Sequence, residues 1–291
     1  MHLVVIGLNH KTAPVELRER LSITESAVPE ALARLREIRC TESLILSTCN
    51  RTEVYACAPA RSYDALIIER LGEISGVDPS VFGPHLYSHA GHKAVAHLFR
   101  VASGIDSMIL GEAQILGQGK DAYSAACGEG FTGSVLNCLF QQAITVGKRV
   151  RTETDIGRGA FSVGSAAVQL AKSIFEQLSG KTALVVGAGK MGDLAMTHLA
   201  ASGVKSVLVA NRTFGRAEEL ASRCGGTAVP FEKLGAALVQ ADIVIASTGA
   251  QEPVITEPMA ASAMRARRGR PIFLIDLAVP RDIAPGVQRL Y

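Results

Sequence analysis

A cysteine at position 49 stands in a polar segment, Ser-Thr-Cys-Asn-Arg at 47–51, between two apolar runs. A structural cysteine behaves as a small apolar residue and is usually buried. The hydroxyl of Thr48, the amide of Asn50 and the cation of Arg51 predict instead a setting that favours the thiolate. A thiolate attacks activated carbonyl carbons and forms thioesters. An ordinary turn between two strands is the alternative interpretation of the same residues.

A second candidate site is a glycine-rich loop between an apolar strand and a helix, the order typical of dinucleotide binding. The loop consists of Gly187, Ala188, Gly189, Lys190, Met191 and Gly192. The first glycine permits a tight turn, the second lets the backbone approach a pyrophosphate, and the third packs the helix on the strand. The helix N-terminus offers free N–H groups to the phosphates. A glycine-rich turn without a ligand is the alternative.

The end of the following strand indicates which dinucleotide binds. An NAD-dependent enzyme usually carries an acidic residue there for the ribose hydroxyls. This chain has Asn211 and Arg212 at that point, with Arg216 shortly after them. An amide does not repel a phosphate and guanidinium groups pair with one, so the sequence favours NADPH over NADH. Arginines that simply face solvent are the alternative.

A thiol and a hydride donor in one chain narrow the expected chemistry. A thiolate that attacks an acyl carbon gives a thioester, and hydride reduces the thioester to an aldehyde. Reduction of an ordinary carboxylic ester without the thiol would be much harder. The two candidate sites together therefore predict an enzyme that reduces an activated acyl group.

The order of apolar patterns predicts an α/β protein with two domains, residues 1–160 and residues 161–291. Strand-like and helical patterns alternate in the first part and predict a small mixed sheet with helices on one face. A helical subdomain follows from about residue 90. Beyond Lys181, apolar strands alternate with helices, which predicts a Rossmann fold, a doubly wound parallel sheet.

Composition excludes several other classes of protein. The chain has 291 residues, 48% of them hydrophobic, and a formal charge of +3, which permits a nucleic-acid partner without requiring one. We expect no membrane span and no secretory signal, and hence a cytoplasmic protein. None of the six cysteines forms a CxxC pair, and His85, His89 and His92 do not share one helical face cleanly. The sequence therefore predicts no metal site.

Several segments resemble the glutamyl-tRNA reductase family, and the resemblance covers essentially the whole chain. They are GLNHKTAPVELRE at 7–19, LSTCNRTEVY at 46–55, HLFRVASGIDSMILGEAQILGQ at 97–118, VGKRVRTETDIGRGAFSVGSAAVQLA at 146–171 and GAGKMG at 187–192. The resemblance implies NADPH-dependent reduction of glutamyl-tRNA to glutamate-1-semialdehyde with release of tRNA. This is the first step of tRNA-dependent 5-aminolevulinate, and hence porphyrin, biosynthesis. It also implies glutamate-1-semialdehyde aminomutase as a partner.

The resemblance also implies roles for individual residues. Cys49 would be the nucleophile that holds the glutamyl thioester, and Arg51 would clamp a carboxylate of the glutamyl group. His97 would assist by acid-base chemistry or by orienting the site, although a core histidine is as good an interpretation of its helical position. The other implied substrate contacts are Thr48, Asn50, Ser107, Glu112, Ala113, Gln114 and Gln118, with Glu112 a candidate for binding the amino group. Ala113 stands where the family often has proline.

The resemblance leaves three points open. The family continues past this sequence into a long helix and a dimerisation domain, so homodimer formation is expected of the full-length family and not of residues 1–291. Basic clusters at 148–151 and 265–270 either contact RNA or are simply solvated. Two alternatives remain: a shikimate-dehydrogenase-like enzyme that acts on a small metabolite, and a non-catalytic binding protein. Neither alternative gives Cys49 a function.

Overall fold

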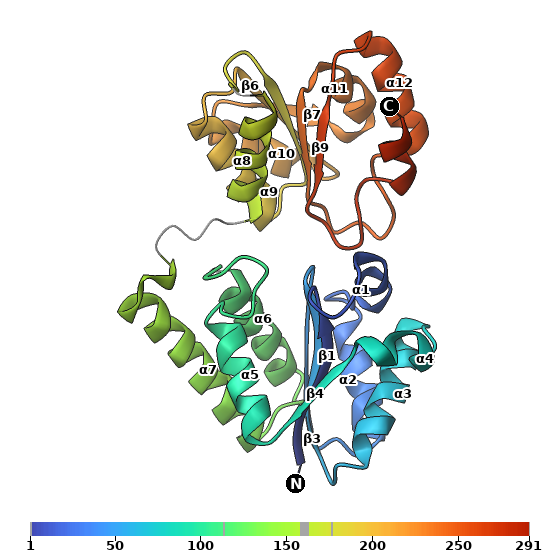
Figure 1. Ribbon diagram of the computed structural model, residues 1–291, viewed down its shortest axis with the longest axis vertical. Coiled ribbons are helices and arrows are strands. Elements are labelled where there is room, and N and C mark those ends of the chain that lie inside the picture. Colours follow the sequence, from blue (N-terminus) through green and yellow to red (C-terminus); the bar gives the residue numbers. More distant parts are fainter. Residues whose placement is uncertain (1, 113, 158–162, 176, 291) are drawn as a thin grey trace. The chain divides into compact units, whose positions relative to one another are not determined.

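The computed structural model describes residues 2–112, 114–157, 163–175 and 177–290 (Figure 1). Two compact units make up the chain, residues 1–160 (unit 1) and residues 161–291 (unit 2). Unit 1 is a mixed α+β structure and unit 2 has a parallel sheet between helices. The expected α/β fold class is therefore confirmed.

Unit 1 is built on a four-stranded sheet in the order β2-β3-β1-β4. Its strands are β1 (His2–Asn9), β2 (Glu42–Thr48), β3 (Arg51–Ala58) and β4 (Tyr87–Ala90). All three pairings are antiparallel, so the sheet is not of mixed direction as expected. The strands β2 and β3 form a hairpin with only two residues between them.

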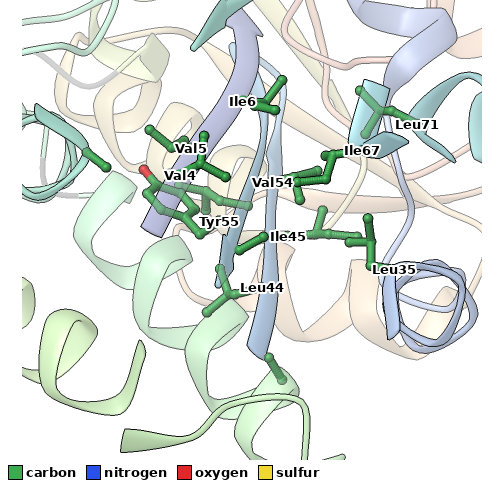
Figure 2. Packing of buried hydrophobic residues seen from close by; sticks show 14 of the residues in the cluster. Val4, Val5, Ile6, Leu35, Leu44, Ile45, Val54, Tyr55, Ile67 and Leu71 are labelled. Atoms are coloured by element: carbon green, nitrogen blue, oxygen red, sulfur yellow. The ribbon is translucent and has the colours of Figure 1, made fainter. Parts of the chain in front are cut away.

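Helices cover both faces of this sheet, and the prediction of one covered face is wrong. In Figure 2, Ile45 and Val54 lie toward Leu35, Ile67 and Leu71, whereas Tyr55 and Leu44 lie on the opposite side. All eight residues of β3 are buried. A strand that is buried on both faces needs apolar neighbours on both, and the continuous apolar run at 54–58 in β3 carries that signal.

The helices of unit 1 surround the sheet (Figure 1). They are α1 (Val15–Leu21), α2 (Val28–Glu37), α3 (Tyr63–Ser75), α4 (Pro79–Phe82), α5 (His92–Ala102), α6 (Gln114–Gly128) and α7 (Ser134–Glu153), with short 3₁₀ turns η1 (Gly83–His85) and η2 (Asp155–Gly157). The rings of Tyr55 on β3 and Phe140 on α7 meet edge to face with centroids 5.2 Å apart.

Glu42, the first residue of β2, fixes the start of α7. Its carboxylate accepts hydrogen bonds from the backbone N–H groups of Gly133 (2.9 Å), Val135 (3.2 Å) and Leu136 (2.7 Å). These N–H groups have no partner inside the helix, and an anion at a helix N-terminus is favoured by the helix dipole. A side chain of the sheet thus caps the longest helix of the unit.

Unit 2 has a five-stranded parallel sheet in the order β7-β6-β5-β8-β9. Its elements are α8 (Val163–Phe175), β5 (Thr182–Val186), α9 (Lys190–Ala201), β6 (Ser206–Asn211), α10 (Phe214–Ser222), β7 (Thr227–Pro230), η3 (Phe231–Lys233), α11 (Leu234–Gln240), β8 (Ile243–Ala246), α12 (Glu257–Arg267), β9 (Phe273–Asp276) and η4 (Pro285–Arg289). Alternate residues of β5 belong to two separate apolar clusters, one on each face. The doubly wound Rossmann arrangement is confirmed.

Candidate active site

Cys49 and Asn50 form the turn between β2 and β3, and neighbouring elements hold that turn in place. The hydroxyl of Thr48 accepts hydrogen bonds from the N–H groups of Asn50 and Arg51, each at 3.2 Å. Arg18 of α1 donates through Nη1 to the carbonyl oxygen of Cys49 (2.5 Å) and to the side-chain oxygen of Asn50 (3.3 Å). The N–H of His10 donates to the carbonyl oxygen of Asn50 at 2.9 Å. Hydrogen bonds within residues 48–51, and from His10 and Arg18, thus fix the shape of the turn.

The Cys49 thiol is only partly exposed, and its environment differs from the expected thiolate site. Burial raises the pKa of Cys49 to about 11, and the carboxylate of Glu112 raises it further. The charges of Arg18 and Arg51 lower that pKa without compensating for burial. The expectation that Thr48, Asn50 and Arg51 provide a setting that favours the thiolate is therefore wrong for the free protein, because burial outweighs them.

Arg51 belongs to a buried polar network and has little contact with solvent. It is 1% exposed, and its Nη1 lies 2.7 Å from Oε1 of Glu53, which is itself fully buried. The guanidinium also donates to the carbonyl oxygen of Asp106 and lies 3.6 Å from that residue's carboxylate. A substrate carboxylate would have to displace one of these partners, so the carboxylate clamp stays a prediction.

Glu53 is the centre of this network. Its carboxylate accepts hydrogen bonds from the hydroxyls of Tyr55 (2.7 Å) and Tyr87 (2.5 Å), and Nε2 of His97 lies 2.8 Å from it. Burial alone would raise the pKa of Glu53, but the charge of Arg51 and the hydrogen bonds hold it at about 2. His97 is therefore held in the site by a carboxylate.

Gly7 of β1 lets the Glu53 side chain reach its partners. Gly7 is paired with Glu53 on one side and with Tyr87 on the other, so the carboxylate must cross β1 at this position. A Cβ atom at residue 7 would lie 2.5 Å from the carbonyl oxygen of Thr52 and 2.8 Å from Cγ of Glu53. A glycine is required there for steric reasons.

The segment between α5 and α6 carries the other expected substrate contacts. The Ser107 hydroxyl is buried without a hydrogen-bond partner among the described residues. Burial raises the pKa of Glu112, whose charge acts on Cys49. Gln114 begins α6, and Gln118 lines a separate groove beside Ser47. Ala113 lies outside the described residues.

His10 and Arg18 lie near Cys49 but were not predicted from the sequence as site residues, although both belong to the segment 7–19. Nδ1 of His10 and Nε of Arg18 are buried and have no hydrogen-bond partner among the residues that the structure describes. Unpartnered buried polar atoms are rare in native proteins and are often completed by a ligand or water. The Ser107 hydroxyl is a third such atom among the residues considered for the site.

The glycine-rich loop of unit 2 has the geometry of a dinucleotide cradle. Gly187 has a φ of 104°, and a Cβ atom there would lie 2.2 Å from the carbonyl oxygen of Ser247. A Cβ atom at Gly192 would lie 2.2 Å from the carbonyl oxygen of Gly187, whereas Gly189 at the start of α9 faces open space. The strand, turn and helix therefore leave room for a pyrophosphate at the helix N-terminus.

A cavity of about 220 Å³ adjoins this loop. Its lining includes Ala188, Gly189, Lys190 and Arg216. Asn211 accepts a hydrogen bond from the N–H of Ala188 at 3.3 Å and so joins the strand end to the loop. Met191 is half-buried, and the exposed Arg212 does not line the cavity. Arg216 is thus the better placed of the two arginines for a phosphate.

Several arginines of the basic clusters make internal contacts. Arg149 pairs with Glu153 on α7 at 2.9 Å, and Arg151 donates to the carbonyl oxygen of Gly111 at 3.0 Å. Arg267 is 1% exposed and lies 3.2 Å from the carboxylate of Asp242. Arg267 is therefore unavailable to RNA, since it stabilises the interior of unit 2.

The described residues contain no cluster of His, Cys, Asp and Glu side chains suited to a metal ion. Within the same residues, no helix has the length and apolar character needed to cross a membrane.

Comparison with known proteins matches both units. Residues 6–154 match the family model for the N-terminal domain of glutamyl-tRNA(Glu) reductase, and residues 169–291 match that for shikimate / quinate 5-dehydrogenase. A glutamyl-tRNA reductase of Stenotrophomonas maltophilia is 50% identical over the whole chain, and one of Priestia megaterium is 47% identical. The chain spans 66% of the length of each. The solved glutamyl-tRNA reductase of Methanopyrus kandleri is 43% identical, with a TM-score of 0.52 over 98% of this chain and 68% of that one.

Proposed function

Because the chain belongs to the glutamyl-tRNA reductase family, we propose that it reduces glutamyl-tRNA(Glu) to glutamate-1-semialdehyde and releases free tRNA. The observation that carries this proposal is the Cys49 turn, a partly exposed thiol among unpartnered buried polar atoms. Unit 1 would be the catalytic glutamyl-tRNA-binding domain and unit 2 the NADPH-binding domain. Because the chain covers two thirds of its relatives' length, homodimer formation and an aminomutase partner also stay proposals, as does a cytoplasmic location.

In the first step, the sulfur of Cys49 forms a bond to the glutamyl carbonyl carbon. The bond from that carbon to the ribose oxygen of the tRNA breaks, and the oxygen takes a proton. The product is a glutamyl thioester on Cys49 and free tRNA. The thioester is a better hydride acceptor than the original ester, which is the reason for a covalent step.

Activation of the thiol follows from the charges around it. The free thiol is protonated near neutral pH because burial and Glu112 raise its pKa. A glutamyl group brings its own ammonium, and an ammonium placed beside Glu112 would offset the carboxylate charge. The charges of Arg18 and Arg51 would then lower the pKa of Cys49 against the effect of burial alone. Under this proposal, substrate binding lowers the pKa of Cys49 and activates it only when an acyl group is present.

The cradle at residues 187–192 suits a dinucleotide, since Gly189 is open and Arg216 lines the adjoining cavity. When bound, NADPH would supply the hydride that reduces the thioester to the aldehyde and frees the thiol. Arg216, with Arg212 nearby, would select the 2′-phosphate of NADPH. Arg216→Ala should weaken NADPH binding about tenfold and leave NADH binding nearly unchanged, as one charge-assisted contact implies.

The decisive experiment is a single turnover with glutamyl-tRNA labelled in the glutamyl group, without NADPH. After acid quench, mass spectrometry should find a glutamyl adduct on Cys49. Cys49→Ser should abolish the adduct, whereas Cys127→Ser, which removes an exposed cysteine of α6, should retain it. Added NADPH should convert the adduct to the semialdehyde. Intact tRNA binding without any adduct would contradict the proposal.

The match of residues 169–291 to the shikimate / quinate 5-dehydrogenase model supports one alternative, a dehydrogenase of a small metabolite. That enzyme would not depend on Cys49. Retention of NADP+-dependent oxidation of a small hydroxy acid in Cys49→Ser would favour it.

A further inference from the structure

A hollow of about 370 Å³ lies beside the buried network of unit 1. Tyr87 and His89 of β4 form one wall, and Lys93, His97 and Arg100 of α5 form the other. The three helical residues are spaced four and three apart, so they share one face of α5. The hollow is open to solvent on its outer side, because Lys93 and Arg100 are exposed.

Three aromatic rings form a rigid platform in this hollow. The rings of Tyr87 and His89 are stacked, with centroids 5.5 Å apart and planes 18° from parallel. The His97 ring lies 5.1 Å from each of them. The buried carboxylate of Glu53 forms hydrogen bonds with Tyr87 and His97 and fixes both rings, whereas His89 is partly exposed. A fixed aromatic surface in an open hollow suits a stacked planar group, such as a nucleobase.

The charges around the platform favour an anion. Among the described residues, neither Lys93 nor Arg100 forms an ion pair with an acidic side chain. Asp106, the acidic residue of the lining, is already 2.5 Å from Lys11 and 3.6 Å from Arg51. Two cations without counterions beside a stacking surface match the two parts of a nucleotide, its phosphate and its base.

We infer that this hollow binds the 3′-terminal nucleotide of the acylated RNA, with the base on His89 and the phosphate between Lys93 and Arg100. The inference rests on the proposed function, because that function requires an RNA end near Cys49. Asn9 lines the hollow and is paired with Arg51, two residues from Cys49. Cys49 stands in the turn directly before β3, so a ribose at the Asn9 end of the hollow would lie near the thiol.

The test uses an unacylated RNA microhelix that ends in CCA, titrated onto the whole chain at several salt concentrations. Lys93→Ala and Arg100→Ala should each weaken binding about tenfold and lower the salt dependence by about one counterion. His89→Ala should weaken binding about tenfold and remove the preference for CCA over an end that lacks the last base. His89→Phe, which keeps an aromatic face, should retain that preference.

Arg61→Ala provides the matched control, because this exposed cation follows the far end of β3 from Cys49. It should bind the microhelix as the parent protein does. The inference is overturned if the variants of the hollow match this control, or if His89→Phe fails as His89→Ala does. It is also overturned if these variants lose affinity for NADPH instead of RNA.

The labelled-adduct experiment separates this inference from the proposed function. A Cys49 adduct that forms at the parent rate at low glutamyl-tRNA in Lys93→Ala, Arg100→Ala and His89→Ala would refute nucleotide binding in the hollow and leave the proposed function intact. Normal microhelix binding with no adduct on the parent protein would refute the function.

Discussion

The clearest energetic consequence of the structure concerns Glu53, and the test is Glu53→Gln. The substitution keeps the shape of the side chain and leaves the guanidinium of Arg51, which is 1% exposed, without its nearest counterion. Loss of one partner of a buried ion pair typically costs about 3–5 kcal/mol.

The pKa of Glu53 gives a second route to the magnitude. A glutamate in an unfolded chain has a pKa of about 4.3, whereas that of Glu53 is held at about 2. At about 1.4 kcal/mol for each pH unit, the carboxylate contributes about 3 kcal/mol at pH 7. Because the folded-state pKa is the lower one, this stability is present above about pH 4.3 and is lost as the pH falls toward 2.

Urea unfolding, monitored by tyrosine fluorescence, measures this effect in unit 1. The chain has no tryptophan, and of its five tyrosines all but Tyr291 lie in unit 1. The difference in unfolding free energy between the parent and Glu53→Gln should be about 3 kcal/mol at pH 7 and should shrink below pH 4.3. Arg51→Met combined with Glu53→Gln should recover part of the loss. Equal midpoints at pH 7, or a difference that does not change with pH, would refute the reasoning.

Three further outcomes follow from the geometry of unit 1. Alkylation of Cys49 by iodoacetamide, measured by peptide mass spectrometry, should rise about tenfold for each pH unit from 7 to 10, because burial raises its pKa to about 11; a plateau near pH 8 would contradict this. Glu42→Ala should lower the unfolding free energy by about 2 kcal/mol in the same urea assay, since three N–H groups of α7 lose their acceptor, and an unchanged midpoint would count against the cap. Gly7→Ala should destabilise unit 1 because its methyl group would lie 2.5 Å from the Thr52 carbonyl oxygen; crystals of the variant with Glu53 unmoved would show that the reasoning is wrong.

The sequence predicts those features that depend on neighbours along the chain. The cysteine turn lies between two strands as its flanking apolar runs indicate, and the glycine loop lies between a strand and a helix. In both cases, adjacent residues are sufficient to specify the local structure. The parallel sheet of unit 2 follows for the same reason, from its alternating apolar strands.

The features that the sequence did not predict depend on strand order. The contact of Glu53 with Tyr87 exists because β1 lies between β3 and β4, with a glycine at the crossing. The contact of Arg18 with Cys49 depends on where α1 packs. The pKa of Cys49 was predicted in the wrong direction because sequence shows the charge of Arg51 but not how far the thiol is buried.

The turn that carries the thiol also affects how unit 1 folds. Two-residue hairpins usually close with mirror-image turns, in which a central residue has positive φ. Neither Cys49 nor Asn50 has a positive φ. The turn therefore relies on contacts from the segment after β1 and from α1, through the backbone N–H of His10 and the guanidinium of Arg18. We expect the hairpin to close late in folding and to open early under native conditions, which would place Cys49 in a part of unit 1 with a low local opening free energy.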